Sequence, residues 1–328
     1  MRHATAARLF WFCSTLVLPG CGGISATESA ALRRAIEPVP SVFDSTLAEM
    51  AHATEDAEIG RILNEPQKTT LGDSDFALPL DPATRSALVS QLDVLQRYAE
   101  TIQTLADRQY RGQFSKAIGD LNAQLLRSVQ TLDGLQASAN APFFPAQVVQ
   151  PVEQGLKGLS GIASLTGEVE IDAYAQRKAL SIVRKANPVI RDYCAAVQVL
   201  IHPSSNPWQR SGRFGLVELA RNNLAAERIW VSKSYEAVMA SRPAQAGASQ
   251  ADWDARRVEI LRTYVGELGR EQAVVERLAG VRSAIGAFAD AHDALAQSEQ
   301  RSFWSAIAAA TDFLNLAAQS LNQSQGLR

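Results

Sequence analysis

The sequence predicts an all-α fold, an elongated antiparallel bundle of long amphipathic helices with no sheet. Three observations predict it. Apolar residues recur at spacings of three and four along most of the 328 residues, which is the period of a helix. The 13 prolines and 20 glycines gather in short stretches between these patterns. No segment alternates apolar and polar residues as a half-buried strand does, and long helices with short connections pack antiparallel.

Each expected helix is defined by an apolar stripe and by the residues that stop it. The expected helices cover residues 43–63, 88–105, 118–135, 146–164, 169–201, 214–240, 249–298 and 303–321. The first ends at a loop over residues 64–82, rich in proline and glycine, which is a candidate break within one bundle domain of residues 42–328. Asp81 and Pro82 suit the N-cap and the first position of the second helix. Gly112 separates the second helix from the third.

Glycine and proline mark the middle helices. Gly155, Gly158 and Gly161 repeat every third residue of the fourth helix, which allows either a close approach of a neighbouring helix or a flexible segment. Pro188 is expected to kink the fifth helix. The segment His202–Pro207 is expected to end that helix, because it holds two prolines within six residues.

The seventh expected helix is the longest. If it is continuous over residues 249–298, its length is about 75 Å at 1.5 Å per residue. Its apolar residues are expected to form one stripe: Val258, Leu261, Val265, Leu268, Val275, Leu278, Val281, Ile285, Phe288 and Leu295. The stripe slips by about one position near Val275, which suits a straight helix better than a strict coiled-coil heptad. In the final helix, Asp312 and Asn315 argue against a membrane span.

The N-terminal residues indicate export from the cytoplasm. Arg2, His3 and Arg8 form a basic start, and the apolar run Leu9–Leu18 follows. A membrane-spanning helix needs about 20 apolar residues, and this run has half that length. A basic start with a short apolar run is typical of a secretory signal peptide.

The residues Leu18-Pro19-Gly20-Cys21 come directly after this run. They resemble the lipobox of bacterial lipoproteins. The resemblance implies a signal peptide over residues 1–20 and a lipidated tether over residues 21–41, with a diacylglycerol on the Cys21 thiol and a further acyl chain, such as palmitate, on its amine. The tether is expected to hold no more than one or two helical turns, over residues 28–36, before Pro38 and Pro40. Gly22 is not the aspartate that retains such proteins in the inner membrane of enteric bacteria. The resemblance therefore implies the outer membrane, facing the periplasm.

Two other interpretations of this segment remain open. Pro19 stands where lipoboxes more often have a small or β-branched residue, and ordinary secretory cleavage after Ala26 is the rival. A cytosolic helix that buries Cys21 is disfavoured, because Pro19, Gly20, Gly22 and Gly23 would break it.

Charge and cysteine usage narrow the classes of function. The chain has 32 basic and 34 acidic residues, so loss of Arg2 and Arg8 leaves 30 against 34, a formal charge of −4. This balance does not suit a protein that neutralises phosphates, and no nucleic-acid partner is expected. Cys13 leaves with the signal peptide and Cys21 carries lipid, so Cys194 cannot form an internal disulfide and is interpreted as a small core residue.

A search for catalytic motifs predicts no enzyme, no metal and no cofactor. Phosphate-binding loops, the nucleophile elbow of hydrolases and paired cysteines are missing from the sequence. Glu49 and His52 match the Glu-x-x-His unit of di-iron bundles, but that site uses the unit twice. Neither His202 nor His292 has a glutamate three residues before it. Asp290, His292 and Asp293 share one turn and are interpreted as part of a solvated face, and His52 and His292 as surface or boundary residues.

The segment after Pro207 is a candidate partner-binding loop. Trp208 is followed by Arg210 and Arg213, and an aromatic residue beside arginines is a common anchor of protein interfaces. The other interpretation is that Trp208 plugs an end of the bundle.

Three functions from different classes follow. The leading one is a lipid-anchored envelope protein with a non-enzymatic scaffold or protein-binding role, whose partners are membrane lipid through acylated Cys21 and an unidentified envelope protein. The alternative is a periplasmic ligand-binding lipoprotein, or an inhibitor or immunity protein. A helical protein like pore-forming toxins is less favoured, because the sequence offers no long apolar hairpin for insertion.

Overall fold

The computed structural model describes residues 23–63, 70–71, 80, 82–107, 109, 111–137, 143–167, 175–202, 214–242 and 248–325. Within these ranges every regular element is a helix, so the predicted all-α fold is confirmed. The elements are α1 (Ala26–Ile36), α2 (Val39–Leu63), α3 (Pro82–Ala106), η2 (Arg111–Gln113), α4 (Phe114–Ala137), α5 (Ala146–Gly167), α6 (Ala175–Ile201), α7 (Leu216–Ala240), α8 (Ala248–Gln297) and α9 (Gln300–Gln325).

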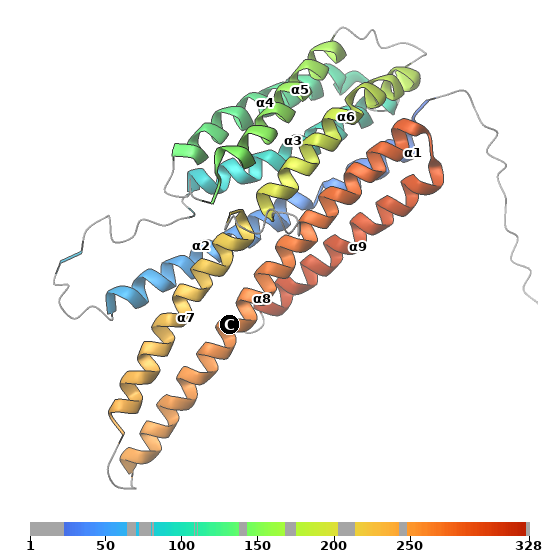
Figure 1. Ribbon diagram of the computed structural model, residues 1–328. Coiled ribbons are helices and arrows are strands. Elements are labelled where there is room, and N and C mark those ends of the chain that lie inside the picture. The colour runs from blue at the N-terminus through green and yellow to red at the C-terminus, as the bar shows by residue number, and fades with distance from the viewer. Residues whose placement is uncertain are drawn as a thin grey trace, which may run out of the picture.

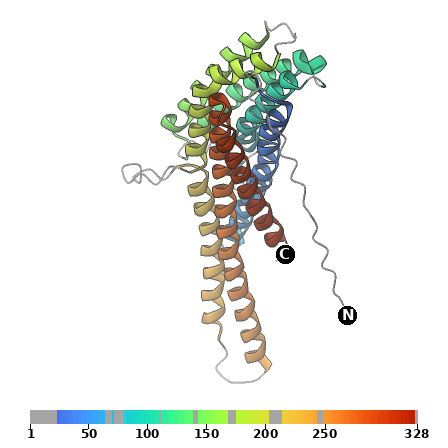
Figure 2. The same ribbon diagram turned by 90° about the vertical axis from the view of Figure 1, so that its right-hand side faces the viewer.

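The helices form an elongated bundle from which one hairpin projects (Figures 1 and 2). Helices α3, α4, α5 and α6 pack in sequence order, and α6 in turn packs on α8, which also contacts α1, α2, α7 and α9. Helices that pack together and follow one another in the sequence run antiparallel. Helices α2 and α7 run in the same direction, because Thr54 contacts Asn223 and Gly60 contacts Trp230.

One apolar core joins all of these helices. It extends from Ile24, before α1, to Leu314 in α9. Two of the three glycines of α5 allow α5 and α6 to approach closely. This is the first of the two expectations for these glycines, the other being a flexible segment. A Cβ atom on Gly155 would lie 2.7 Å from the ring of Tyr193, and one on Gly158 would lie 2.8 Å from the side chain of Val189. Nothing lies within 4 Å at Gly161.

The N-terminal segment is packed from its first described residues, where a tether was expected. The Ser25 side chain caps α1 and forms a capping box with Glu28, which satisfies amide groups at the start of the helix. Leu32 and Ile36 are fully buried. The prolines that indicated a loop do not prevent this packing, because Pro40 stands in the first turn of α2, where the missing amide has no partner to lose. The expected tether over residues 21–41 therefore holds the whole of α1 and, after a turn at residues 37 and 38, the start of α2.

Helix α8 is continuous over 50 residues, but its apolar residues do not face one side. Leu278 and Val281 are fully buried, whereas Val265 is 66 % exposed. Val265 and Val281 are sixteen residues apart, so at about 100° per residue they lie about 160° apart around the axis. The prediction of one stripe along a single face of the helix was therefore wrong. The slip near Val275 is the point at which the apolar face of α8 changes sides.

Candidate functional site

The end of the α7–α8 hairpin is held together by specific side-chain contacts around Trp253. Figures 1 and 2 show the hairpin extending beyond the ends of α2 and α9. Trp253 of α8 is only 6 % exposed there, and its indole nitrogen donates a 2.7 Å hydrogen bond to the carbonyl oxygen of Val238 on α7. The guanidinium groups of Arg242 and Arg257 lie 5.5 and 5.6 Å from the centre of the indole ring, within the range of a cation–π attraction.

A cluster of charged side chains fixes the base of the hairpin where α2, α7 and α8 meet. Arg277 of α8 is fully buried and pairs with Glu49 of α2. About two turns earlier on α8, Arg270 lies 3.3 Å from carboxylate oxygens of both Glu227 and Glu267. Breaking a buried ion pair strands the remaining charge away from water, so the cluster holds the hairpin in one orientation on the bundle.

One carboxyl group of this cluster has a strongly perturbed pKa. Burial raises the pKa of Glu227 to about 9, and the neighbouring Glu267 carboxyl adds to the rise while Arg270 opposes it. Two carboxyl groups this close share a proton rather than both ionise. Glu227 therefore keeps its proton at neutral pH, and its contact with Arg270 is a hydrogen bond more than an ion pair.

An exposed apolar surface lies on α8, beside the face that packs on α7. It consists of Val258, Leu261, Val265 and Leu268, and we call it the α8 stripe. These side chains are between 43 and 66 % exposed. Isolated exposed apolar residues are common, whereas a row of them on one face of a helix is a candidate interaction surface. The sequence predicted these four residues as members of one continuous stripe with Val275–Leu295. The slip near Val275 was the signal that they belong to another face.

A cleft of about 460 Å³ lies between α8 and α9 where α9 approaches its end. Glu276, Ala279, Gly280 and Leu316 are among its lining residues. Leu316 is 62 % exposed. Ala279 lies eighteen residues after Leu261, five whole turns of an α-helix, so this cleft continues the line of the α8 stripe.

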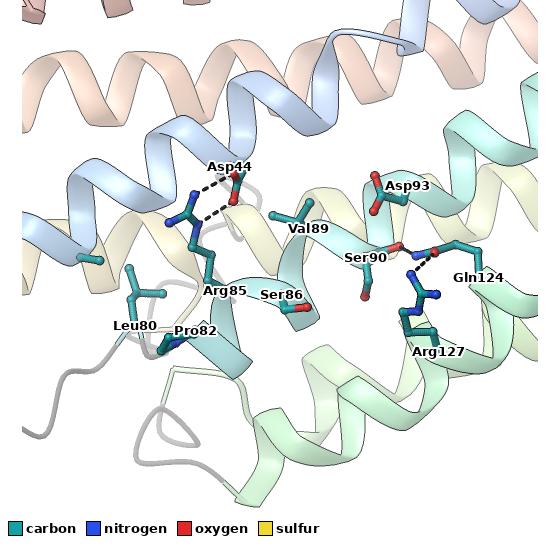
Figure 3. Close-up of a pocket in the computed structure, with 11 residues that line it drawn as sticks. Asp44, Leu80, Pro82, Arg85, Ser86, Val89, Ser90, Asp93, Gln124 and Arg127 are labelled. Carbon is teal, nitrogen blue, oxygen red and sulfur yellow. Dashed lines mark hydrogen bonds and ion pairs between the residues drawn. The ribbon is translucent and has the colours of Figure 1, made fainter.

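A second cleft, of about 510 Å³, lies between α2, α3 and α4 (Figure 3). Arg85 of α3 makes a bidentate ion pair with Asp44 of α2, with distances of 2.6 and 2.7 Å. Burial raises the pKa of Asp93, while the positive charges of Arg97 and Arg127 oppose the rise. The cleft thus presents charges of both signs. The Arg85 guanidinium is already paired with Asp44.

His292 is part of a buried hydrogen-bond chain, contrary to the expectation of a surface or boundary residue. The Tyr98 hydroxyl lies 2.8 Å from Nε2 of His292, and Nδ1 lies 3.0 Å from Oδ1 of Asn187. The amide nitrogen of Asn187 donates to Asp293, so its oxygen accepts, Nδ1 carries the proton, and the tyrosine hydroxyl donates to Nε2. Burial lowers the pKa of His292 to about 3. The imidazole is therefore neutral, and hydrogen bonds to both of its nitrogens fix its orientation. This arrangement suits a structural role in the core rather than proton transfer.

The remaining candidate residues from the sequence lie in separate parts of the molecule or outside the described residues. Cys194 is buried in the core, as expected. His52 is largely exposed beside Glu55, while Glu49 pairs with Arg277 instead. Cys21, Trp208, Arg210 and Arg213 lie outside the described residues. Among the described residues no group of three or more histidine, cysteine or acidic side chains is arranged to hold a metal ion.

Two further findings bear on function. In the described part of the chain, no helix combines the length and the apolar character needed to cross a membrane. Comparison with protein-family models, with curated proteins and with solved structures finds no match to this chain. Any function must therefore be argued from the residues and geometry above.

Proposed function

We propose that the protein is a lipid-anchored, non-enzymatic scaffold of the bacterial cell envelope, held in the outer membrane by acylated Cys21 and binding a protein partner in the periplasm. The observation that carries the proposal is the α8 stripe, an apolar helix face left uncovered on a hairpin that projects from the bundle. The lipobox-like Leu18-Pro19-Gly20-Cys21 supplies the anchor.

The packing of the N-terminus supports an anchor held close to the body. The amide of Ile24 donates to the carbonyl oxygen of Gln176 at the start of α6, and Ile24 is buried. Only two residues, Gly22 and Gly23, separate Cys21 from that packed position. An acyl chain contributes about 0.8 kcal/mol per buried methylene, and more than one chain is needed for stable anchoring.

The anchored end and the hairpin end are far apart. Arg184 of α6 donates to the carbonyl oxygen of Ala296, so the last turn of α8 lies near the start of α6 and hence near Ile24. The first turn of α8 is about 75 Å away at 1.5 Å per residue. The α8 stripe then lies about 40–60 Å along the rod from the anchored end.

A second candidate is a ligand-binding or inhibitor lipoprotein, and the cleft between α2, α3 and α4 is the observation that favours it. Its charged groups of both signs would suit a small zwitterionic ligand. The Arg85–Asp44 pair already uses one group of each sign. Fewer charged groups are then left for a ligand, so the scaffold function is favoured over this candidate.

Metabolic labelling with a radioactive or clickable palmitate tests the anchor. We expect label on the wild-type chain and on Cys194→Ala, and none on Cys21→Ser. Cys194→Ala is the matched control because it removes the buried thiol and leaves the candidate acylation site intact. Cell fractionation of the same strains should find the wild type with the membranes and Cys21→Ser in the soluble fraction. Equal labelling of the wild type and Cys21→Ser would overturn the proposal.

A further inference from the structure

We propose that the α8 stripe and the adjoining α8–α9 cleft form a docking groove for an amphipathic helix of a second protein whose flanking positions are acidic. The inference deepens the proposed function, on which it rests, because it names the surface and the chemistry of the partner. It depends on the geometry of the hairpin and not on the lipid.

The shape of the groove favours a helix as occupant. Helix α9 packs antiparallel on α8 so closely that a Cβ atom on Gly280 would lie 3.1 Å from the Cβ of Ala317. Eight residues after Ala317, α9 ends at Gln325, about level with Gln272 of α8. The α8 stripe begins one turn beyond that level. A helix placed there continues an established helix–helix interface along the same rod.

The length of the groove suits several turns of a partner helix. Val258 and Leu268 are ten residues apart, about 15 Å along the axis, and Ala279 lies about 16 Å further along. Apolar residues at spacings of three and four are what an i, i+3, i+4, i+7 anchor pattern fits. No heavy atom lies within 4 Å of a Cβ placed on Gly266 or Gly269, so beside the stripe a partner helix meets bare backbone and can approach closely.

The charges beside the stripe select acidic flanks on the partner. Arg262 is exposed on one side of the stripe, and Arg257 lies on the other side, where its Nε donates a 3.2 Å hydrogen bond to the Tyr235 hydroxyl. Asp254 stands in line with the stripe beyond its outer end, and Glu276 lines the α8–α9 cleft at the inner part of the groove. A partner helix therefore meets arginines beside the outer part of the groove, where acidic residues at its flanking positions pair with them.

A second copy of this chain fits the groove less well. An antiparallel pair that sets Val258 against Leu268 of the second copy, and Leu261 against Val265, has its two-fold axis beside residue 263. The two copies of Arg262 then face each other across the axis. Like charges at flanking positions oppose a coiled-coil pair, so the geometry points to a different protein.

Synthetic helices test the chemistry of the groove. The probes are two labelled peptides of three heptads with leucine at the a and d positions, one with glutamate and one with lysine at e and g. Binding is measured by fluorescence anisotropy to the full chain carrying Cys21→Ser, so that no acyl group competes for the stripe. We expect the glutamate peptide to bind at least about tenfold more tightly than the lysine peptide. Equal binding of the two peptides would overturn the proposal.

Variants of α8 locate the interaction. Val265→Asp should weaken binding of the glutamate peptide at least about tenfold, and Arg262→Glu should reverse the preference between the peptides. Thr263→Asp is the matched control, because it adds the same charge at an exposed position on the opposite side of α8 and should leave binding unchanged. If Val265→Asp and Thr263→Asp bind alike, the stripe is not the docking surface.

Photo-crosslinking in cells identifies the occupant. A crosslinking amino acid at position 265 should capture one protein through a peptide with acidic flanks and an apolar stripe, and the same amino acid at position 263 should not. Capture of a second copy, crosslinking to lipid or the absence of any product at 265 would each overturn the proposal. The palmitate experiment reports on the anchor independently, so failure of the anchor and failure of the groove give different results.

Discussion

Tyr98 and His292 are 194 residues apart in the sequence, and their side chains meet in the core with the hydroxyl oxygen 2.8 Å from the imidazole Nε2. The two rings are tilted by 49° with their centres 5.5 Å apart. This contact joins α3 to α8 and, through Asn187, both to α6. A buried polar chain whose members all have partners specifies one arrangement of helices, because any other arrangement leaves donors and acceptors unpaired.

His292 predicts a loss of stability in acid. The pKa of its imidazole is about 3 in the folded chain, against 6.5 for a free histidine, so the unfolded state binds the extra proton first. The contribution of His292 to the free energy of unfolding should therefore fall as the pH drops from about 6.5 toward 3, by up to about 1.4 kcal/mol per pH unit. Urea unfolding at several pH values measures the slope. His292→Gln cannot titrate and should reduce this slope, and equal slopes in the two proteins would contradict the prediction.

Glu227 predicts the opposite dependence in alkali. Its pKa is about 9 in the folded chain, against 4.5 for a free glutamate, so the folded state holds a proton that the unfolded state has released. Stability should fall as the pH rises from about 4.5 through 9, again by up to about 1.4 kcal/mol per unit. The two effects oppose each other between about 4.5 and 6.5, which predicts a plateau there. Glu227→Gln should remove the alkaline fall and turn the plateau into a rise of stability between about pH 4.5 and 6.5, and thermal unfolding at pH 4.5, 6.5 and 8.5 checks this.

Two glycines of α5 predict changes of opposite sign. Gly155→Ala places a Cβ atom 2.7 Å from the Tyr193 ring, and this overpacking should cost about 1–3 kcal/mol. Gly161→Ala meets open space, and the better helix former should add about 0.5–1 kcal/mol. Chemical denaturation of both variants is the measurement. A stabilising Gly155→Ala would show that α5 and α6 are further apart than described above.

Trp253 predicts a local effect at the hairpin end. Trp253→Ala removes the indole and its hydrogen bond to Val238, and the cost should be about 3 kcal/mol, confined to the hairpin. Hydrogen exchange followed by mass spectrometry should show roughly 100-fold less protection near Val238 and Trp253, with α3 and α4 unchanged. Loss of protection throughout the chain would show instead that the tip contributes to global stability.

The sequence predicted the helices well because their periodicity is a local property. Residues 249–298 were expected to form one helix, and α8 covers Ala248–Gln297. The face that each residue presents depends on distant neighbours, and that was harder to predict. Val265 and Val281 carry the same side chain, yet α9 stops short of the first while the second is buried in the bundle.

The errors concern residues whose local pattern is ambiguous. Prolines before residue 41 suggested a tether, but Pro40 fits the first turn of α2 and the segment packs. His292 between two aspartates suggested a solvated face, because nothing local indicates that Tyr98 and Asn187 supply its partners. The Arg277–Glu49 pair links residues 228 apart, and no spacing rule connects them. The polar contacts of the core are thus set by tertiary packing, which one sequence without its fold does not display.

Because α8 contains no proline and its backbone ladder is unbroken, it acts mechanically as a rigid lever. Its inner half is clamped by α6, α9 and α1, and its outer half carries the surface proposed to hold a partner. A sideways pull at the tip becomes a torque at the fulcrum, where Arg270 and Glu227 meet. Strain from a bound partner would therefore reach a buried carboxyl group that keeps its proton at neutral pH.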